Sequence, residues 1–202
     1  MILPVRLLIA RIRLRRHALA VPATLLLVDV QRAFDDPGWG LRNNPQAELA
    51  VAWLLAAWRD RAAPLVHVRH VSRGPTSRFR AGTPAAEFKP EALPAPGEDV
   101  IEKSVNSAFI GTDLAHRLQA RRCAALVIAG LTTDHCVSTT ARMAANLGFA
   151  TTVVADATAT FDRVAPDGEV FPAELMHRTA LASLRGEFAE IATADEAIAL
   201  LA

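Results

Sequence analysis

Short apolar runs alternate with longer amphipathic stretches along the chain, and this pattern predicts strands that alternate with helices. The run over 24–30 (TLLLVDV) is almost continuously apolar, which is typical of a strand covered on both faces. Elsewhere apolar residues recur at helical spacing, as at Val51, Leu54, Leu55 and Trp58. The alternation predicts an α/β fold with helices on both faces of a parallel sheet. The expected strands cover 24–30, 65–71, 99–103, 124–129, 149–155 and 190–193, and the expected helices cover 44–59, 113–122, 135–148, 172–189 and a last one from 194.

Local signals set two of the expected helix starts. Asn44 followed by Pro45 is typical of an N-cap and a first helical residue. Thr193 and Glu196 have the spacing of a capping box. The segment 72–98 holds five prolines and shows no periodicity. A stretch of this length inside a compact domain is usually functional, so we predict that it forms a substrate-pocket loop.

Composition and charge narrow the class of protein. The length of 202 residues predicts one domain, and 51% hydrophobic residues exclude a disordered chain. A net charge of +1 gives the protein no strong overall electrostatic field, so we expect a small-molecule substrate and no nucleic-acid partner. Since no apolar run approaches the ~20 residues of a membrane span, we expect no membrane partner. Two cysteines do not make a disulfide framework, and the cytoplasm is the expected location.

The first twenty residues differ from the rest, because they contain five arginines and no acidic residue. Their apolar part precedes most of the arginines, whereas a secretory signal has the opposite order. A transit peptide and a basic surface tail stay open as alternatives. We expect residues 1–22 to be a basic extension outside the fold and residues 23–202 to form the domain.

Cys136 is a candidate nucleophile because it lies where a predicted strand ends and the first turn of a predicted helix begins. Unpaired backbone N–H groups and the positive end of the helix dipole meet at such a point. They favour a thiolate over a thiol, and they can hold a developing oxyanion. The alternative is that Cys136 is a small buried apolar residue.

Two charged residues stand at the carboxyl ends of other predicted strands, Asp29 after the first and Lys103 at the end of the third. Those ends share one edge of a parallel sheet, where ligands bind in open α/β folds. Asp29, Lys103 and Cys136 are therefore expected to converge as an acid/base, a cation and a nucleophile. Taken singly, the alternative for Asp29 is a helix-cap or turn carboxylate in the following loop, and the alternative for Lys103 is a solvated surface residue.

The remaining candidate residues concern metal binding and the pocket wall. His67 and His70 lie three apart on a strand, so they face opposite sides and are not expected to bind one metal. His70 is close enough to the strand end to line a pocket, with a structural role as the alternative. For the aromatic candidates the alternative is core packing. The predicted pocket residues are Phe34, Trp39, His70, Phe109, His135 and Phe161.

Three segments carry a resemblance to the isochorismatase-like cysteine hydrolase superfamily. They are LLLVDVQRAF with Asp29, EKSVNSAFIGTDL with Lys103, and AGLTTDHCVSTTARMAANLGF with Cys136. The resemblance implies a three-layer α/β/α sandwich with a six-stranded parallel sheet of order 3-2-1-4-5-6. It also implies an Asp–Lys–Cys triad and a non-proline cis peptide bond between Leu131 and Thr132.

The resemblance further implies a hydrolase that cleaves a C–N bond of a small amide, ureide, lactam or carbamoyl compound. Asp29 would take the proton of Cys136, and the thiolate would form an acyl-thioester. The backbone N–H groups of Thr132 and Cys136 would form the oxyanion hole. Lys103 would hold Asp29 and favour the anionic forms.

Some features separate this chain from other branches of that superfamily. After His67 it lacks the Asp-x-His pair of the nicotinamidases, so we expect no metal and no other cofactor. True isochorismatases lack the nucleophilic Cys, so the presence of Cys136 counts against vinyl-ether hydrolysis. That activity and a catalytically inactive hydrolase-like scaffold stay as alternatives. The resemblance implies a homodimer or homotetramer.

Overall fold

The computed structural model describes residues 22–199 and 201. The basic extension expected over 1–22 therefore lies, apart from Pro22, outside the described residues. No helix among the described residues is both long enough and apolar enough to cross a lipid bilayer.

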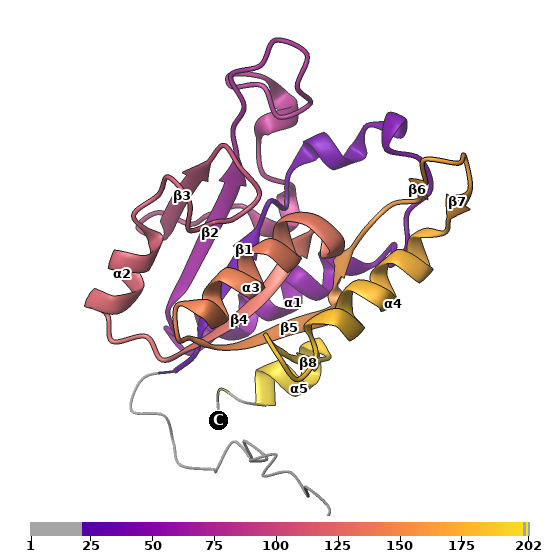
Figure 1. Cartoon of the computed structure of the whole chain (residues 1–202). Helices are drawn as coiled ribbons and strands as arrows, with labels where there is room; N and C mark the ends of the chain where they lie inside the picture. The colour runs from indigo at the N-terminus through magenta and orange to yellow at the C-terminus, as the bar shows by residue number, and fades with distance from the viewer. Residues whose placement is uncertain (1–21, 200, 202) are drawn as a thin grey trace, which may run out of the picture.

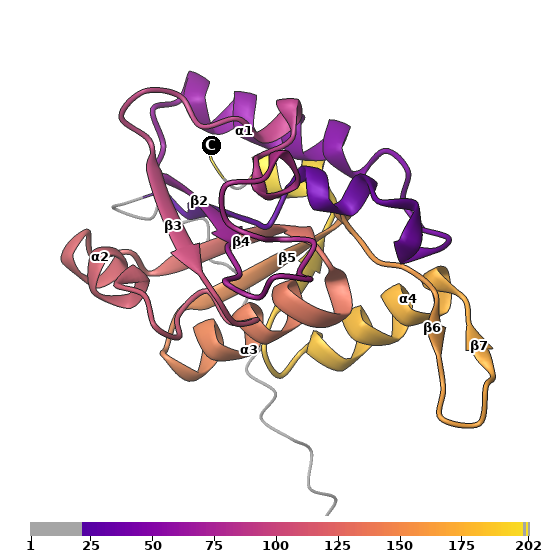
Figure 2. The ribbon, with the colours of Figure 1, turned by 90° about the horizontal axis from the view of Figure 1, so that it is seen from above.

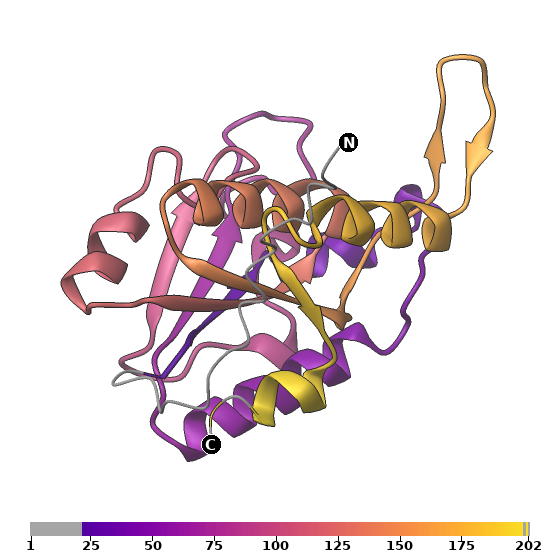
Figure 3. The same ribbon diagram turned by 60° about the horizontal axis from the view of Figure 1, so that its bottom comes forward.

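Six parallel strands form the central sheet in the order β3-β2-β1-β4-β5-β8 (Figure 1). This confirms the predicted order, since β8 is the sixth strand of the sheet. An additional two-stranded hairpin, β6 and β7, interrupts the alternation and extends away from the body of the molecule (Figure 3). The strands are β1 (Thr24–Val28), β2 (Leu65–His70), β3 (Asp99–Lys103), β4 (Ala125–Leu131), β5 (Ala150–Ala159), β6 (Arg163–Val164), β7 (Val170–Phe171) and β8 (Glu190–Ala192).

Helices cover both faces of the sheet, as Figure 2 and Figure 3 show. Helices α1 (Ala47–Asp60) and α5 (Ala194–Ala199) lie on one face, and α2 (Leu114–Ala120), α3 (Ser138–Asn146) and α4 (Ala173–Leu184) lie on the other. A π-helical turn, η5 (Thr133–Val137), joins β4 to α3. The short 3-10 helices are η1 (Arg32–Asp35), η2 (Pro37–Trp39), η3 (Pro84–Ala86) and η4 (Pro90–Ala92).

The position of strand β1 in the sheet explains why its sequence is almost continuously apolar. Leu25 and Leu27 pack in the core under α1, whereas Leu26 and Val28 pack in the core under α2 and α3. Alternate side chains of a strand point to opposite faces, and here both faces are covered. The strand therefore carries apolar residues on both faces, from Leu25 to Val28.

Two local predictions have different outcomes. Helix α1 begins at Ala47 and not at Asn44, because the Asn44 side chain donates to the carbonyls of Ala155 (3.1 Å) and Thr158 (2.8 Å). Asn44 thus ties the entry of α1 to β5 instead of capping the helix. The capping box of α5 is confirmed: Thr193 N donates to Glu196 Oε2 (2.8 Å), and Glu196 N donates to Thr193 Oγ1 (3.3 Å).

Gly130 allows β1 and β4 to approach each other at their carboxyl ends. It pairs with Val28 and has a φ of 125°. A Cβ atom at this position would lie 1.9 Å from the carbonyl oxygen of Val28. Only glycine fits here, because any side chain would collide with backbone that cannot move without opening the sheet.

We predict that Gly130→Ala destabilises the protein much more than a matched change at a glycine of positive φ in open space. Gly168, in the turn of the β6–β7 hairpin, has a φ of 89° and nothing within 4 Å of its Cβ position. Gly168→Ala should cost ~1–2 kcal/mol for the left-handed conformation alone. Gly130→Ala should cost several kcal/mol more because overpacking adds to that strain. Urea unfolding of the two variants measures the difference, and equal losses would contradict the close approach.

Candidate active site

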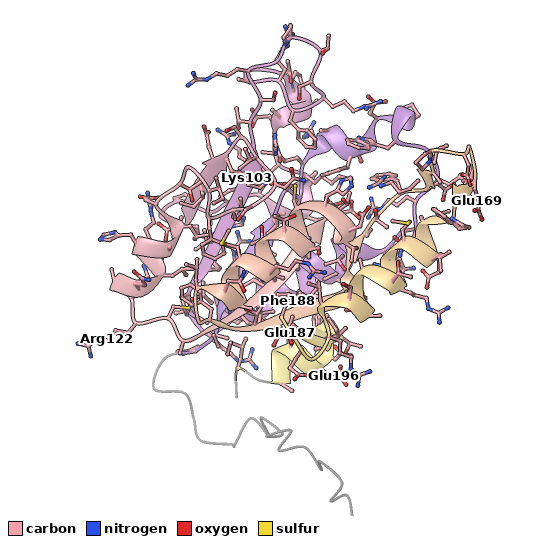
Figure 4. The ribbon with its side chains drawn as sticks, viewed as in Figure 1. Lys103, Arg122, Glu169, Glu187, Phe188 and Glu196 are labelled. Carbon is pink, nitrogen blue, oxygen red and sulfur yellow. The ribbon has the colours of Figure 1, made fainter. Side chains whose placement is uncertain are left out.

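Three side chains meet at the carboxyl edge of the sheet, where Figure 4 labels Lys103. Asp29 follows β1 directly, Lys103 is the last residue of β3, and Cys136 lies in the π-helical turn after β4. Lys103 Nζ lies 2.6 Å from Asp29 Oδ2 and 3.4 Å from Cys136 Sγ. The structure thus places a carboxylate, an ammonium and a thiol in direct contact.

The backbone at Asp29 turns sharply as the strand ends. Asp29 has a φ of 53°, in the left-handed region that non-glycine residues rarely adopt. Its N–H donates to the carbonyl of Val68 (2.9 Å), so the residue still belongs to the sheet on one side. Such conformations persist where the surrounding structure holds them, and they cluster at functional sites. The turn directs the Asp29 side chain to the edge of the sheet, where it meets Lys103.

The turn that carries Cys136 directly follows Thr132, which is 2% exposed. The peptide bond between Leu131 and Thr132 is cis. The carbonyl of Thr132 accepts hydrogen bonds from the N–H groups of His135 and Val137, both at 3.2 Å. Among the described residues, the N–H of Thr132 itself donates to no protein acceptor. One backbone donor next to Cys136 is therefore left without a protein partner.

Burial dominates the electrostatics of the site. Asp29 and Lys103 are 1% and 3% exposed. Loss of solvent raises the pKa of Asp29, although the charge of Lys103, its hydrogen bond to Asp29 and the nearby Cys136 thiol partly oppose this. Asp29 Oδ1 is buried and has no hydrogen-bond partner within the part of the chain that the structure describes. Asp29 therefore has a free oxygen and an enhanced affinity for a proton.

The thiol of Cys136 differs from the sequence-based expectation of a thiolate. Burial raises the pKa of Cys136 to about 12, and the charge of Asp29 adds to this effect, while Lys103 lowers the pKa only in part. The expectation considered the start of the helix but not the loss of water or the neighbouring carboxylate. Cys136 is a thiol at neutral pH, so a base must remove its proton when it reacts.

His70 adjoins the same three residues. Its Nδ1 lies 3.3 Å from Lys103 Nζ, and burial together with the charge of Lys103 lowers the pKa of His70 to about 4. Ligand atoms of Asp29, His70 and Cys136 lie within 4.8 Å of one another, and these donor types suit a transition metal. Lys103 Nζ contacts all three, however, so the place of a cation is taken by the ammonium group.

Three of the four predicted aromatic pocket residues come together. Phe34, Trp39 and Phe161 have ring centroids 5.3–6.0 Å apart. Phe79, from the loop over 72–98, joins them and also lies 5.1 Å from the ring of His70. This aromatic cluster (Phe34, Trp39, Phe79 and Phe161) therefore adjoins the triad through His70.

Two predicted pocket residues lie elsewhere. Phe109 is buried in the core under α2 and α3 and stacks on Phe149, with ring centroids 6.0 Å apart. His135 directly precedes Cys136 in the π-helical turn, and its side chain is 53% exposed. Its Nε2 lies 3.5 Å from Asp134 Oδ2. Phe109 is thus a core residue, and His135 lies on the rim.

Sequence reasoning did not assign a role to Gln31, which is fully buried beside the site. Its Nε2 donates to the carbonyls of His70 (3.0 Å) and Ala86 (2.7 Å), and its Oε1 accepts from His70 N (2.8 Å). Gln31 thus joins the ends of β1 and β2 to the loop over 72–98. A polar residue just after a buried strand was the available signal, but its partners are distant in sequence.

A cavity lies at the end of the molecule opposite to these residues. A cavity of about 420 Å³ opens where β4, β5 and β8 begin, beside Phe188 and Glu187 (Figure 4). The residues that line it are mostly small and apolar, and none of the triad residues is among them. Because ligands of open α/β sheets bind at the carboxyl edge, the triad and not this cavity marks the candidate active site.

Comparison with known proteins gives one family. The Isochorismatase domain model matches residues 23–196. The isochorismatase family protein YrdC of Bacillus subtilis (strain 168), which is uncharacterized, is 42% identical over 174 residues, or 86% of this chain and 93% of that protein. A crystal structure described as a hydrolase of the isochorismatase family from Chromobacterium violaceum ATCC 12472 has a TM-score of 0.87 and 48% identity, covering 89% of this chain and 93% of that one. Maleamate amidohydrolase of Pseudomonas putida is 33% identical over 147 residues, which are 64% of this chain and 68% of that enzyme.

The raised pKa of Cys136 predicts how the free protein reacts with iodoacetamide. With a pKa of about 12, the thiolate fraction should grow about tenfold for each pH unit between pH 7 and 10. The alkylation rate of Cys136 should rise accordingly, without a plateau, in a Cys123→Ala background that removes the other cysteine. Mass spectrometry at timed intervals measures the rate, and Cys136→Ala in the same background is the blank. A rate that levels off below pH 8 would show a stabilised thiolate and contradict this picture.

Proposed function

The chain belongs to the isochorismatase family of hydrolases, and from this premise we propose that it is a cysteine hydrolase that cleaves a C–N bond. The substrate would be a small amide, ureide, lactam or carbamoyl compound, and Cys136 would carry the acyl group as a thioester. One observation carries the proposal: Lys103 Nζ touches both Asp29 Oδ2 and Cys136 Sγ. A base, a cation and a nucleophile within contact distance are what covalent acyl transfer requires.

In the first half-reaction, Asp29 takes the proton of the Cys136 thiol as sulfur attacks the carbonyl carbon. Its raised pKa and its free Oδ1 suit this role, because a buried carboxylate of higher pKa is a stronger base. The new S–C bond places negative charge on the carbonyl oxygen. When the C–N bond breaks, Asp29 returns the proton to the leaving nitrogen, which departs as a neutral amine or ammonia.

In the second half-reaction, water replaces the amine. Asp29 takes one proton from the water, and the hydroxide oxygen attacks the thioester carbon. The C–S bond then breaks, and the sulfur regains its proton from Asp29. The products are a carboxylic acid, or the corresponding carbamic acid, and the free enzyme. One carboxylate thus serves as base and acid in both halves.

The backbone N–H groups of Thr132 and Cys136 would stabilise the oxyanion in each half. The Thr132 N–H supports this role because it has no protein acceptor among the described residues. A single donor of this kind is typically worth ~3 kcal/mol in the transition state. The donors lie in the same turn as the nucleophile, so attack by sulfur places the carbonyl oxygen near them.

Lys103 would stabilise the negatively charged groups that the reaction requires. Its ammonium holds Asp29 Oδ2 and lies against Cys136 Sγ, so it stabilises either the carboxylate or the forming thiolate. The likeness to maleamate amidohydrolase supports C–N chemistry. The presence of Cys136 in contact with a base favours this reaction over vinyl-ether hydrolysis, which needs no such nucleophile.

We predict that Cys136→Ala and Asp29→Asn each lower hydrolysis by at least ~10³-fold, because triad members act as a unit. Ammonia release from a panel of primary amides and ureides measures the activity. Cys123→Ala is the matched control and should keep near wild-type activity, since among the described residues the Cys123 thiol hydrogen-bonds with Thr24 Oγ1 and the carbonyl of Ala125 and with none of the triad residues. Unchanged activity in Cys136→Ala would end the thioester mechanism and favour the vinyl-ether or another reaction. Absence of any turnover by the wild type across the panel would favour the inactive scaffold.

A further inference from the structure

The turn that carries Cys136 is held by a hydrogen bond to a residue of helix α4, which is distant in sequence. Thr133, the first residue of η5, is fully buried, and its Oγ1 lies 2.9 Å from Nδ1 of His177 on α4. His177 is itself 5% exposed. Burial lowers the pKa of His177, although Glu174 and Asp134 partly oppose this, so the ring is neutral and one hydrogen bond joins it to the hydroxyl.

A second anchor holds the next residue of the turn. Asp134 Oδ1 accepts from Thr160 Oγ1 (2.5 Å), and Asp134 Oδ2 accepts from Arg163 Nε (3.0 Å). Thr160 and Arg163 lie just before and within β6, in the segment that leads to α4. Two consecutive side chains of the turn are therefore fixed by partners that come from the region between 160 and 177.

These anchors act on a turn of unusual backbone conformation. It is a π-helical turn, a rare form that is frequent at functional sites. The residue before it, Thr132, makes no side-chain cap, and its Oγ1 has no hydrogen-bond partner over residues 22–199. Strand β4 holds the backbone on one side of Thr132, and the Thr133–His177 contact holds it on the other.

We infer that His177, through its hydrogen bond with Thr133, is a positioning residue that fixes the Thr132 N–H where the oxyanion develops. The inference rests on the proposed function. His177 is too deeply buried beneath the turn to be assigned a contact with substrate. It acts on the reaction through Thr133, and displacement of a reacting group by about 1 Å can slow a reaction about 100-fold.

Two reagents distinguish a change in the position of the oxyanion donor from a change in the reactivity of the Cys136 sulfur. p-Nitrophenyl acetate would acylate Cys136: the thiol proton passes to Asp29, sulfur adds to the carbonyl carbon to give an oxyanion, and the ester C–O bond then breaks to release p-nitrophenolate. Iodoacetamide alkylates the same sulfur with loss of iodide and forms no oxyanion. The ratio of the two rates, measured in a Cys123→Ala background at one pH, therefore reports on the oxyanion donors and not on the thiol.

We predict that Thr133→Val and His177→Leu lower the acylation rate ~10-fold or more, while alkylation changes less than about twofold. Thr133→Ser keeps the hydroxyl and should keep the wild-type ratio. The double variant Thr133→Val/His177→Leu removes both polar groups, so it should recover stability lost in the single variants. Its acylation should nevertheless stay as slow as in either single variant, because both changes break the same contact.

Thr140→Val is the matched control. Thr140 is also fully buried, and its Oγ1 accepts from the N–H of Ala108 (3.1 Å) on the other side of α3. Loss of this hydroxyl should lower stability but leave the ratio of acylation to alkylation unchanged. A change in the ratio equal to that of Thr133→Val would show that general loosening is responsible and would overturn the inference.

The remaining outcomes are also decisive. A wild-type ratio in Thr133→Val or His177→Leu would overturn the inference and leave the proposed function standing. If His177→Leu does not fold, the comparison of Thr133→Val with Thr133→Ser decides. If the wild type is never acylated at Cys136, as judged by the mass of the labelled peptide, the proposed function fails and the inference fails with it.

Discussion

The buried ammonium group of Lys103 is the interaction on which the candidate site depends. It contacts Asp29, His70 and Cys136 at once, in a place from which water is almost excluded. A carboxylate buried alone would be very costly, and breaking such a pair by removing one partner typically costs ~3–5 kcal/mol. The ammonium thus makes it possible to keep a base of raised pKa next to a thiol of raised pKa inside the protein.

The sheet provides the geometry that this contact needs. Asp29 and Lys103 are 74 residues apart in sequence, yet the parallel order places the ends of β1 and β3 on one edge. Gly130 lets β4 lie against β1, and β4 leads directly into the turn with Cys136. The side chains of Gln31, Thr133 and Asp134 then tie the strand ends to the loops and helices around them. A rigid sheet sets the coarse position, and buried hydrogen bonds set the fine one.

Much of the fold could be predicted from the sequence, since continuous apolar runs and helical periodicity are local signals. Local reasoning also brought Asp29, Lys103 and Cys136 to one edge, because parallel strands all end there. It failed where distant partners decide the outcome. Asn44 has the sequence of an N-cap but bonds to β5, Phe109 belongs to the core, and the β6–β7 hairpin has strands of two residues each.

The chemistry of Cys136 shows the same limit. The start of a helix is visible in the sequence and predicts a lowered pKa, whereas burial and the charge of Asp29 appear only when the chain is folded. The same holds for Phe79 and His177, which reach the site from a proline-rich loop and from α4. No spacing in the sequence connects them with Cys136.

A crystal structure at a resolution that separates the atoms of the Lys103 side chain tests the central claim most directly. We predict that Nζ lies within hydrogen-bonding distance of Asp29 Oδ2 and in contact with Cys136 Sγ, with no water between them. An Nζ turned toward solvent, or one more than ~4 Å from the Asp29 carboxylate, would contradict the account.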